Sequence, residues 1–113
     1  MTMREVISRA QRGAREFQFD ATEPFFAGHF PGQPILPGVF QLEMVRQAAE
    51  ETLKLPVVIR AVRKAKFQRP IRPGETVRLE LKLSEDGDGF LAHARFFVGE
   101  QAAGETQLRL GKP

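Results

Sequence analysis

The chain has 113 residues, of which 42% are hydrophobic and 27% are charged. This length and balance are typical of a single globular domain, so we expect one domain over residues 1–113. The absence of cysteine excludes a disulfide framework, a thiolate metal site and a cysteine nucleophile, and it fits a reducing cytoplasm. No segment has the ~18–20 uninterrupted apolar residues of a membrane helix, and residues 1–15 lack the apolar centre of a signal peptide.

The net charge of +3 points to an acidic partner, without choosing among nucleic acid, an anionic membrane and an acidic protein. All ten aromatic residues are phenylalanine, which favours an apolar lining over the stacking surfaces that bind single-stranded nucleic acid. We therefore expect neither a nucleic-acid partner nor a membrane span.

The first predicted elements are two short strands, residues 4–10 and 14–19, which form a hairpin that turns at residues 11–13. Phe17 and Phe19 fall on one face of the second strand. Residues 22–38 follow as an ordered loop, because four prolines within them remove backbone donors and prevent a regular helix.

A helix of about 15 residues is predicted after Gly38, since good helix formers continue without glycine or proline as far as Pro56. Its apolar residues spread well beyond one narrow stripe. A helix of this kind needs to be buried on several sides.

Four further strands are predicted at residues 57–68, 76–83, 90–98 and 103–110, with turns at 70–74, 85–89 and 99–101. Alternation is clearest from Val77 to Leu83, where every second residue is apolar, as in an antiparallel strand with one wet face. The pattern predicts an α+β fold with one helix and about six strands in a curved antiparallel sheet. One sheet covers only one side of such a helix, so we expect a dimer to cover the other side of the helix and the edges of the sheet.

Residues 22–47, TEPFFAGHFPGQPILPGVFQLEMVRQ, closely resemble the active-site segment of the bacterial 3-hydroxyacyl-acyl-carrier-protein dehydratases. The shared features are GHFPG, the prolines of QPILPG, a glutamate fourteen positions after the histidine, and a glutamine four positions further on. Residues 65–83, AKFQRPIRPGETVRLELKL, resemble the strand pair that follows the helix in that family. The resemblance extends over residues 5–110.

The resemblance implies the hot-dog fold, in which one central helix is wrapped by an antiparallel sheet, in agreement with the pattern of elements. Members of ordinary length carry an N-terminal helix and a proline-rich segment that this sequence lacks, which favours an accessory pathway over the housekeeping fatty-acid enzyme. We expect the reaction to serve fatty-acid, polyene or related specialised lipid synthesis. The family also implies active sites that straddle a homodimer, or a higher oligomer of dimers. We expect no cofactor, and no metal, because the two histidines stand in such different parts of the sequence.

The same resemblance implies the roles of the site residues. His29 would be the base that removes the proton beside the thioester carbonyl, and Glu43 the acid that protonates the leaving hydroxyl, with its pKa raised by the apolar helix around it. Gly38 and Val39 lie where the free N–H groups at a helix start can hold the carbonyl oxygen. Gln47, one turn after Glu43, would orient its carboxyl group.

Other candidate residues follow from their residue types. Phe30 and Phe67, with Phe25 and Phe26, either line an acyl tunnel or belong to the core. Residues 52–74 hold seven basic residues and no acidic one, which is typical of a solvated strand face or of a surface that docks the acidic acyl carrier protein. The docking candidates are Arg60, Arg63, Lys64, Lys66, Arg69 and Arg72.

We therefore expect a cytoplasmic dehydratase that converts carrier-bound 3-hydroxyacyl thioesters to trans-2-enoyl thioesters. Two alternatives remain: a hot-dog acyl thioesterase, and a non-catalytic acyl-binding or structural subunit. His93 matches no motif, so we expect it to have a structural or solvent-facing role.

Overall fold

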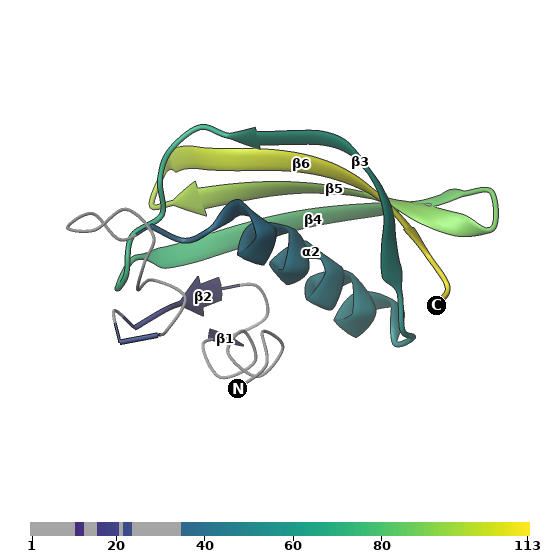
Figure 1. Cartoon of the computed structure of the whole chain (residues 1–113), viewed down its shortest axis with the longest axis horizontal. Coiled ribbons are helices and arrows are strands. Elements are labelled where there is room, and N and C mark those ends of the chain that lie inside the picture. Colours follow the sequence, from purple (N-terminus) through teal and green to yellow (C-terminus); the bar gives the residue numbers. More distant parts are fainter. Residues whose placement is uncertain (1–10, 13–15, 21, 24–34) are drawn as a thin grey trace.

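The structure is a computed structural model that describes residues 11–12, 16–20, 22–23 and 35–113. These residues form a helix and an antiparallel sheet (Figure 1). In chain order the elements are β1 Gln11–Arg12, β2 Glu16–Gln18, α2 Gly38–Leu53, β3 Val58–Phe67, β4 Thr76–Asp86, β5 Gly89–Val98 and β6 Gln101–Gly111.

The sheet runs in the order β1-β2-β4-β5-β6-β3, and every neighbouring pair is antiparallel. Strands β3 to β6 are long and curve over α2, which lies against the hollow side of the sheet (Figure 1). The expected α+β architecture, a helix covered by a curved antiparallel sheet, is confirmed.

Helix α2 begins at Gly38, directly after Pro37, as the proline-rich segment before it predicts. It ends at Leu53, where Lys54 adopts the left-handed conformation (φ 58°) and donates its N–H to the carbonyl of Glu50 at 2.7 Å. Pro56 then prevents the helix from resuming, so the chain turns into β3.

The core lies between α2 and the sheet. From the helix, Met44, Val45 and Ala49 are fully buried, and so are the two alanines of β5, Ala92 and Ala94. Burying a side chain the size of Met or Val stabilises the fold by about 1.5–3 kcal/mol. The sheet contributes Val77, Leu79, Ala92, Ala94, Phe96, Leu108 and Leu110 to this core.

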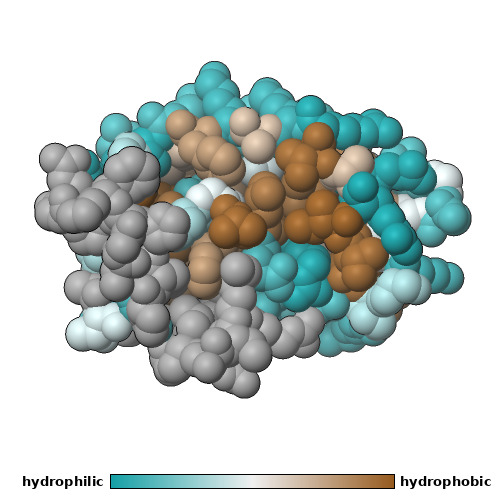
Figure 2. Space-filling view, in the orientation of Figure 1, coloured by the Kyte–Doolittle hydropathy of each residue, from teal (hydrophilic) through white to brown (hydrophobic). Residues whose placement is uncertain are grey.

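Strand β3 forms one edge of the sheet and pairs only with β6 among the described strands. None of its ten residues is fully buried, and Val62 and Phe67 remain 48% and 47% exposed. Val39 on the helix is 59% exposed. Figure 2 shows hydrophobic residues gathered in the middle of the face on which α2 lies, with hydrophilic residues beside them.

Three predicted turns were wrong in their bounds, one of them at residues 99–101, where Gln101 already lies in β6 and pairs with Val98. Gln11 and Arg12, placed in a turn by the sequence, lie in β1 and pair with Phe17 and Glu16. Of the expected turn at residues 85–89, only Gly87 and Asp88 lie outside the strands, with Gly87 at φ 64°. Strand pairing continues through polar residues here because the turn needs only two residues, one of them with the positive φ that glycine adopts freely.

The described part of the chain holds no helix with both the length and the apolar character needed to span a membrane.

Candidate active site

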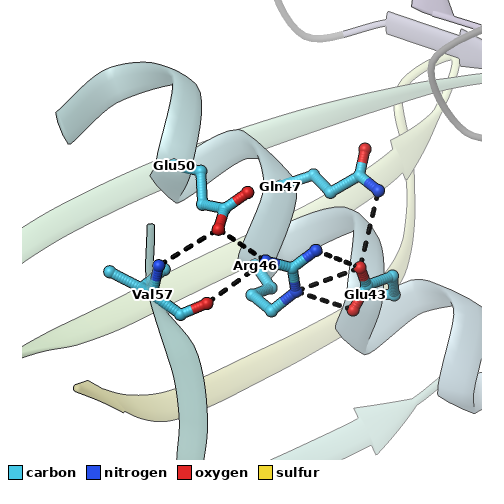
Figure 3. Close-up of polar contacts among 5 residues, drawn as sticks. All are labelled: Glu43, Arg46, Gln47, Glu50 and Val57. Carbon is cyan, nitrogen blue, oxygen red and sulfur yellow. Dashed lines mark hydrogen bonds and ion pairs between the residues drawn. The ribbon is translucent and has the colours of Figure 1, made fainter. Parts of the chain in front are cut away.

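Glu43 lies near the middle of α2, with its side chain 19% exposed. Its carboxylate accepts hydrogen bonds from the guanidinium of Arg46, one turn along the helix, as Figure 3 shows. Arg46 Nε lies 3.0 Å from Glu43 Oε1 and 2.8 Å from Oε2, and Arg46 Nη2 also donates to Oε1. Such a contact through two nitrogens fixes the orientation of the carboxylate as well as its position.

Gln47 lies one turn beyond Glu43 on the same helix and is buried. Its Nε2 lies 3.4 Å from Glu43 Oε1, at the long end of a hydrogen bond. The structure therefore brings together Glu43 and Gln47, as their spacing of four residues predicts.

Arg46 also contacts a second carboxylate. Its Nη1 lies 2.8 Å from Glu50 Oε2 and donates to the carbonyl of Val57 at 3.2 Å (Figure 3). Glu50 Oε2 in turn accepts the N–H of Val57 at 3.1 Å. The hydrogen bond with Glu43, followed by the charges of Glu43 and Glu50, raises the pKa of Arg46 above its usual value, against the effect of burial. Arg46 is therefore a fixed cation that joins the helix to the residues leading into β3.

Two other predicted site residues meet at the start of α2. A Cβ on Gly38 would lie 2.9 Å from Cε2 of Phe67, so the Phe67 ring rests directly on the glycine. The N–H groups of Phe40 and Gln41 are directed to the carbonyl of Pro37 at 3.1 and 3.4 Å. Gly38 and Val39 are the first residues of the helix, where amides have no acceptor within the helix.

His29 and Phe30, and with them Phe25 and Phe26, lie outside the described residues. Their predicted roles as base and as tunnel lining stay predictions.

The six predicted docking residues lie on β3 and the segment after it, and several have acidic partners. Lys64 pairs with Glu105 at 2.8 Å, and Arg63 lies 3.5 Å from Asp86. Arg60 donates to the carbonyl of Lys112. Lys66 and Arg72 are exposed.

Arg69, also among the docking candidates, is held more tightly than the others. Its guanidinium donates to both oxygens of Glu75, at 2.9 and 2.5 Å, and the side chain is 19% exposed. This pairing lowers the pKa of Glu75. Arg69 therefore anchors the turn before β4.

His93 lies on the outer face of the sheet, where its Nε2 is 2.5 Å from Glu105 Oε2. Hydrogen bonds from Lys64 and then from His93 lower the pKa of Glu105 to about 2. The structure thus gives His93 a contact within a surface ion-pair cluster, apart from Glu43 on α2.

Sequence reasoning missed two features of α2. Arg46 was not singled out, although it stands three residues after Glu43 and four before Glu50, the spacings at which helix side chains pair. Gln41 is only 3% exposed, and its Oε1 has no hydrogen-bond partner in the described part of the chain. The buried face of a helix is predicted from the spacing of its apolar residues, so a polar residue such as Gln41 is expected to be exposed even when it is buried.

Comparison with known proteins identifies the family. The ApeI-like family, described as ApeI dehydratase, matches residues 5–105. The 3-hydroxyacyl-[acyl-carrier-protein] dehydratase FabZ of Chlamydia trachomatis serovar L2 is 42% identical over 96 residues, which cover 76% of this chain and 63% of that protein. The FabZ of Chloroflexus aggregans is 41% identical over 105 residues, covering 86% of this chain and 73% of that protein. The chain thus spans less than two thirds of the length of the Chlamydia relative.

Solved structures agree on the fold. The dehydratase heterocomplex ApeI:P from Xenorhabdus doucetiae superimposes with a TM-score of 0.75 at 30% identity, over 90% of this chain and 92% of that one. A probable thioesterase from Bartonella henselae superimposes at 0.68 with 16% identity, over 85% of this chain and 84% of that one, which shows a shared fold alone. The expected hot-dog fold is confirmed. Because the family match takes in nearly all of the sequence, the chain belongs to the ApeI-like family of dehydratases, relatives of FabZ.

Proposed function

We propose that the chain removes water from 3-hydroxyacyl groups carried as thioesters on an acyl carrier protein, leaving trans-2-enoyl thioesters. The observation that carries this proposal is the family match over residues 5–105, a range that contains His29, Glu43 and Gln47. The thioesterases among the solved structures do not favour hydrolysis, because their likeness is one of fold.

In the proposed reaction, His29 takes the proton from the carbon beside the carbonyl and Glu43 gives a proton to the departing hydroxyl, so that one water leaves. The position of Glu43 on a largely buried helix supports this role, because few waters can compete for its carboxyl group. The hydrogen bond from Gln47 supports its role in orienting that group.

The carbonyl oxygen of the thioester is proposed to bind at the start of α2, where the amides of Gly38 and Val39 have no acceptor in the helix. Phe67 would cover the same position from β3 and exclude water from it.

The carrier protein is proposed to dock on the basic residues of β3 and the turn after it. Lys66 and Arg72 are exposed, and Arg63 and Lys64 retain 51% and 45% exposure despite their acidic partners. Exposed cations of this kind speed the encounter with an acidic protein more than they tighten the complex. Arg60 and Arg69 donate hydrogen bonds to Lys112 and Glu75 of the same chain, so they would contribute less to carrier binding.

A second copy of the chain is proposed to pair along β3. An edge strand presents unpaired N–H and C=O groups that attract another strand, and β3 is long, exposed and partly apolar at Val62 and Phe67. The same contact would cover exposed Val39. The active sites would then lie at the dimer interface, in the cytoplasm, and the oligomer would be this dimer or an assembly of such dimers.

The test is a dehydration assay on a 3-hydroxyacyl carrier protein that records enoyl absorbance and free thiol in parallel. The wild-type chain should produce enoyl thioester without releasing thiol, and His29→Ala and Glu43→Gln should each lose more than about ten-fold in rate. Thiol release without enoyl absorbance would indicate a thioesterase. Carrier binding without either signal would indicate a non-catalytic subunit.

A further inference from the structure

The guanidinium of Arg46 lies between two carboxylates, Glu43 on one side and Glu50 on the other (Figure 3). The three side chains are 14–19% exposed, so they are held largely away from water. One guanidinium therefore holds two carboxylates in fixed positions, one on each side of it.

Few other charges face this group from the described parts of the fold. The residues of β4 and β5 that pack toward α2 are apolar, among them Leu79, Ala92 and Phe96. At the segment leading into β3, Arg46 and Glu50 contact the backbone of Val57. Among described residues, the contacts of Glu43 are therefore those with Arg46 and Gln47.

We propose that Arg46 is a positioning residue for the dehydration, which fixes the Glu43 carboxyl group and ties it through Glu50 and Val57 to the segment leading into β3. The inference rests on the proposed function. Glu50 is a second counter-ion, which holds the Arg46 guanidinium in place from the side opposite Glu43. Arg46 thus acts through Glu43 and does not touch the substrate.

The geometry requires an arginine at this position. A guanidinium presents Nε and Nη2 to one carboxylate while Nη1 faces another, whereas the single nitrogen of lysine cannot hold both in fixed directions. The link to Val57 also places the catalytic carboxylate and the proposed dimer edge in one hydrogen-bonded group.

The experiment compares kcat and KM for Arg46→Met, Arg46→Lys and Glu50→Gln with those of the wild-type chain on a carrier-bound 3-hydroxyacyl substrate. Arg46→Met should lower kcat by about ten-fold to a hundred-fold with little change in KM, because a misplaced catalytic group slows the chemical step. Arg46→Lys should recover part of the loss. Glu50→Gln should lower kcat by less than Arg46→Met. Arg78→Met, which removes an arginine paired with Glu80 on the outer face of β4, is the matched control and should keep the wild-type kcat.

A double-mutant cycle separates positioning from general destabilisation. In a Glu43→Gln background Arg46→Met should have almost no further effect on kcat, since the group it positions is already lost. Thermal unfolding of each variant checks that it is folded at the assay temperature. An active wild-type chain whose folded Arg46→Met variant keeps kcat within about two-fold would overturn the inference and leave the proposed function standing. A wild-type chain that makes no enoyl thioester would overturn the proposed function, and the inference with it.

Discussion

The ring of Phe67, at the end of β3, rests on Gly38, at the start of α2, so closely that a Cβ on the glycine would lie 2.9 Å from Cε2 of the ring. This contact joins the two elements on which the proposed oxyanion site depends. It also explains why the residue after Pro37 has no side chain.

Gly38→Ala should therefore force the Phe67 ring to move. Because the ring is 47% exposed it can yield, so the loss of stability should lie near the low end of the range for overpacking, about 1 kcal/mol, while the rate of dehydration falls more sharply. Urea unfolding and the enoyl assay measure the two effects. Adding Phe67→Leu should restore stability to Gly38→Ala; if it does not, the clash with the ring is not the cause.

Val62→Lys should separate a dimer that forms along β3. A lysine on an exposed edge strand disfavours pairing with another strand, and Val62 is 48% exposed, so the fold itself should tolerate the change. Light scattering after size-exclusion chromatography measures the mass of the assembly. Ser84→Lys adds the same charge to β4, which β5 and β6 separate from β3, and should leave the mass unchanged. A Val62→Lys variant of unaltered mass would remove β3 from the interface, and assembly only with a different chain would indicate a heterocomplex.

Glu105→Gln should reduce stability at neutral pH. The hydrogen bonds from Lys64 and His93 lower the pKa of Glu105 from its ordinary 4.5 to about 2 in the folded chain. The ionised group therefore stabilises the fold above pH 4.5, and this contribution disappears as the pH falls through about 2. The difference in urea unfolding between wild type and Glu105→Gln should shrink over that window. A difference that stays constant down to the lower pH would contradict the role given to the carboxylate.

Met44→Ala should destabilise the core without touching the proposed chemistry. Met44 is fully buried next to Glu43, and removing its side chain should cost about 2–5 kcal/mol. Met44→Leu, which keeps most of the volume, should cost less than about 1.5 kcal/mol. Thermal unfolding compares the two, and equal losses would show that the packing of this position does not depend on volume.

The sequence predicted the strands and the helix whose residues follow a regular pattern. Val77 and Leu79 alternate with charged residues, so β4 could be read directly, and the run of helix formers between Gly38 and Pro56 identified α2. The bounds of the turns were less accurate. Polar residues such as Asp86 can lie in a strand whenever the turn beyond it needs only two residues.

The sequence predicted those site residues that a motif or a helical spacing identifies. It did not predict contacts between residues that only the tertiary fold brings together. The four-residue spacing of Glu43 and Gln47 gave their contact in advance. Arg46 also donates a hydrogen bond to the backbone carbonyl of Val57. Val57 lies near the helix only because the chain turns back after Lys54. The contact of Phe67 with Gly38 joins residues far apart in the sequence, and no local pattern reports it.

Intact-protein mass spectrometry of the carrier after incubation with the wild-type chain tests the central claim most directly. The proposed dehydration predicts a carrier whose acyl chain is still attached and is lighter by the mass of one water, with Glu43→Gln leaving the chain almost unchanged. A carrier stripped of its acyl group, or one that keeps the full hydroxyacyl mass with the wild-type protein, would contradict it.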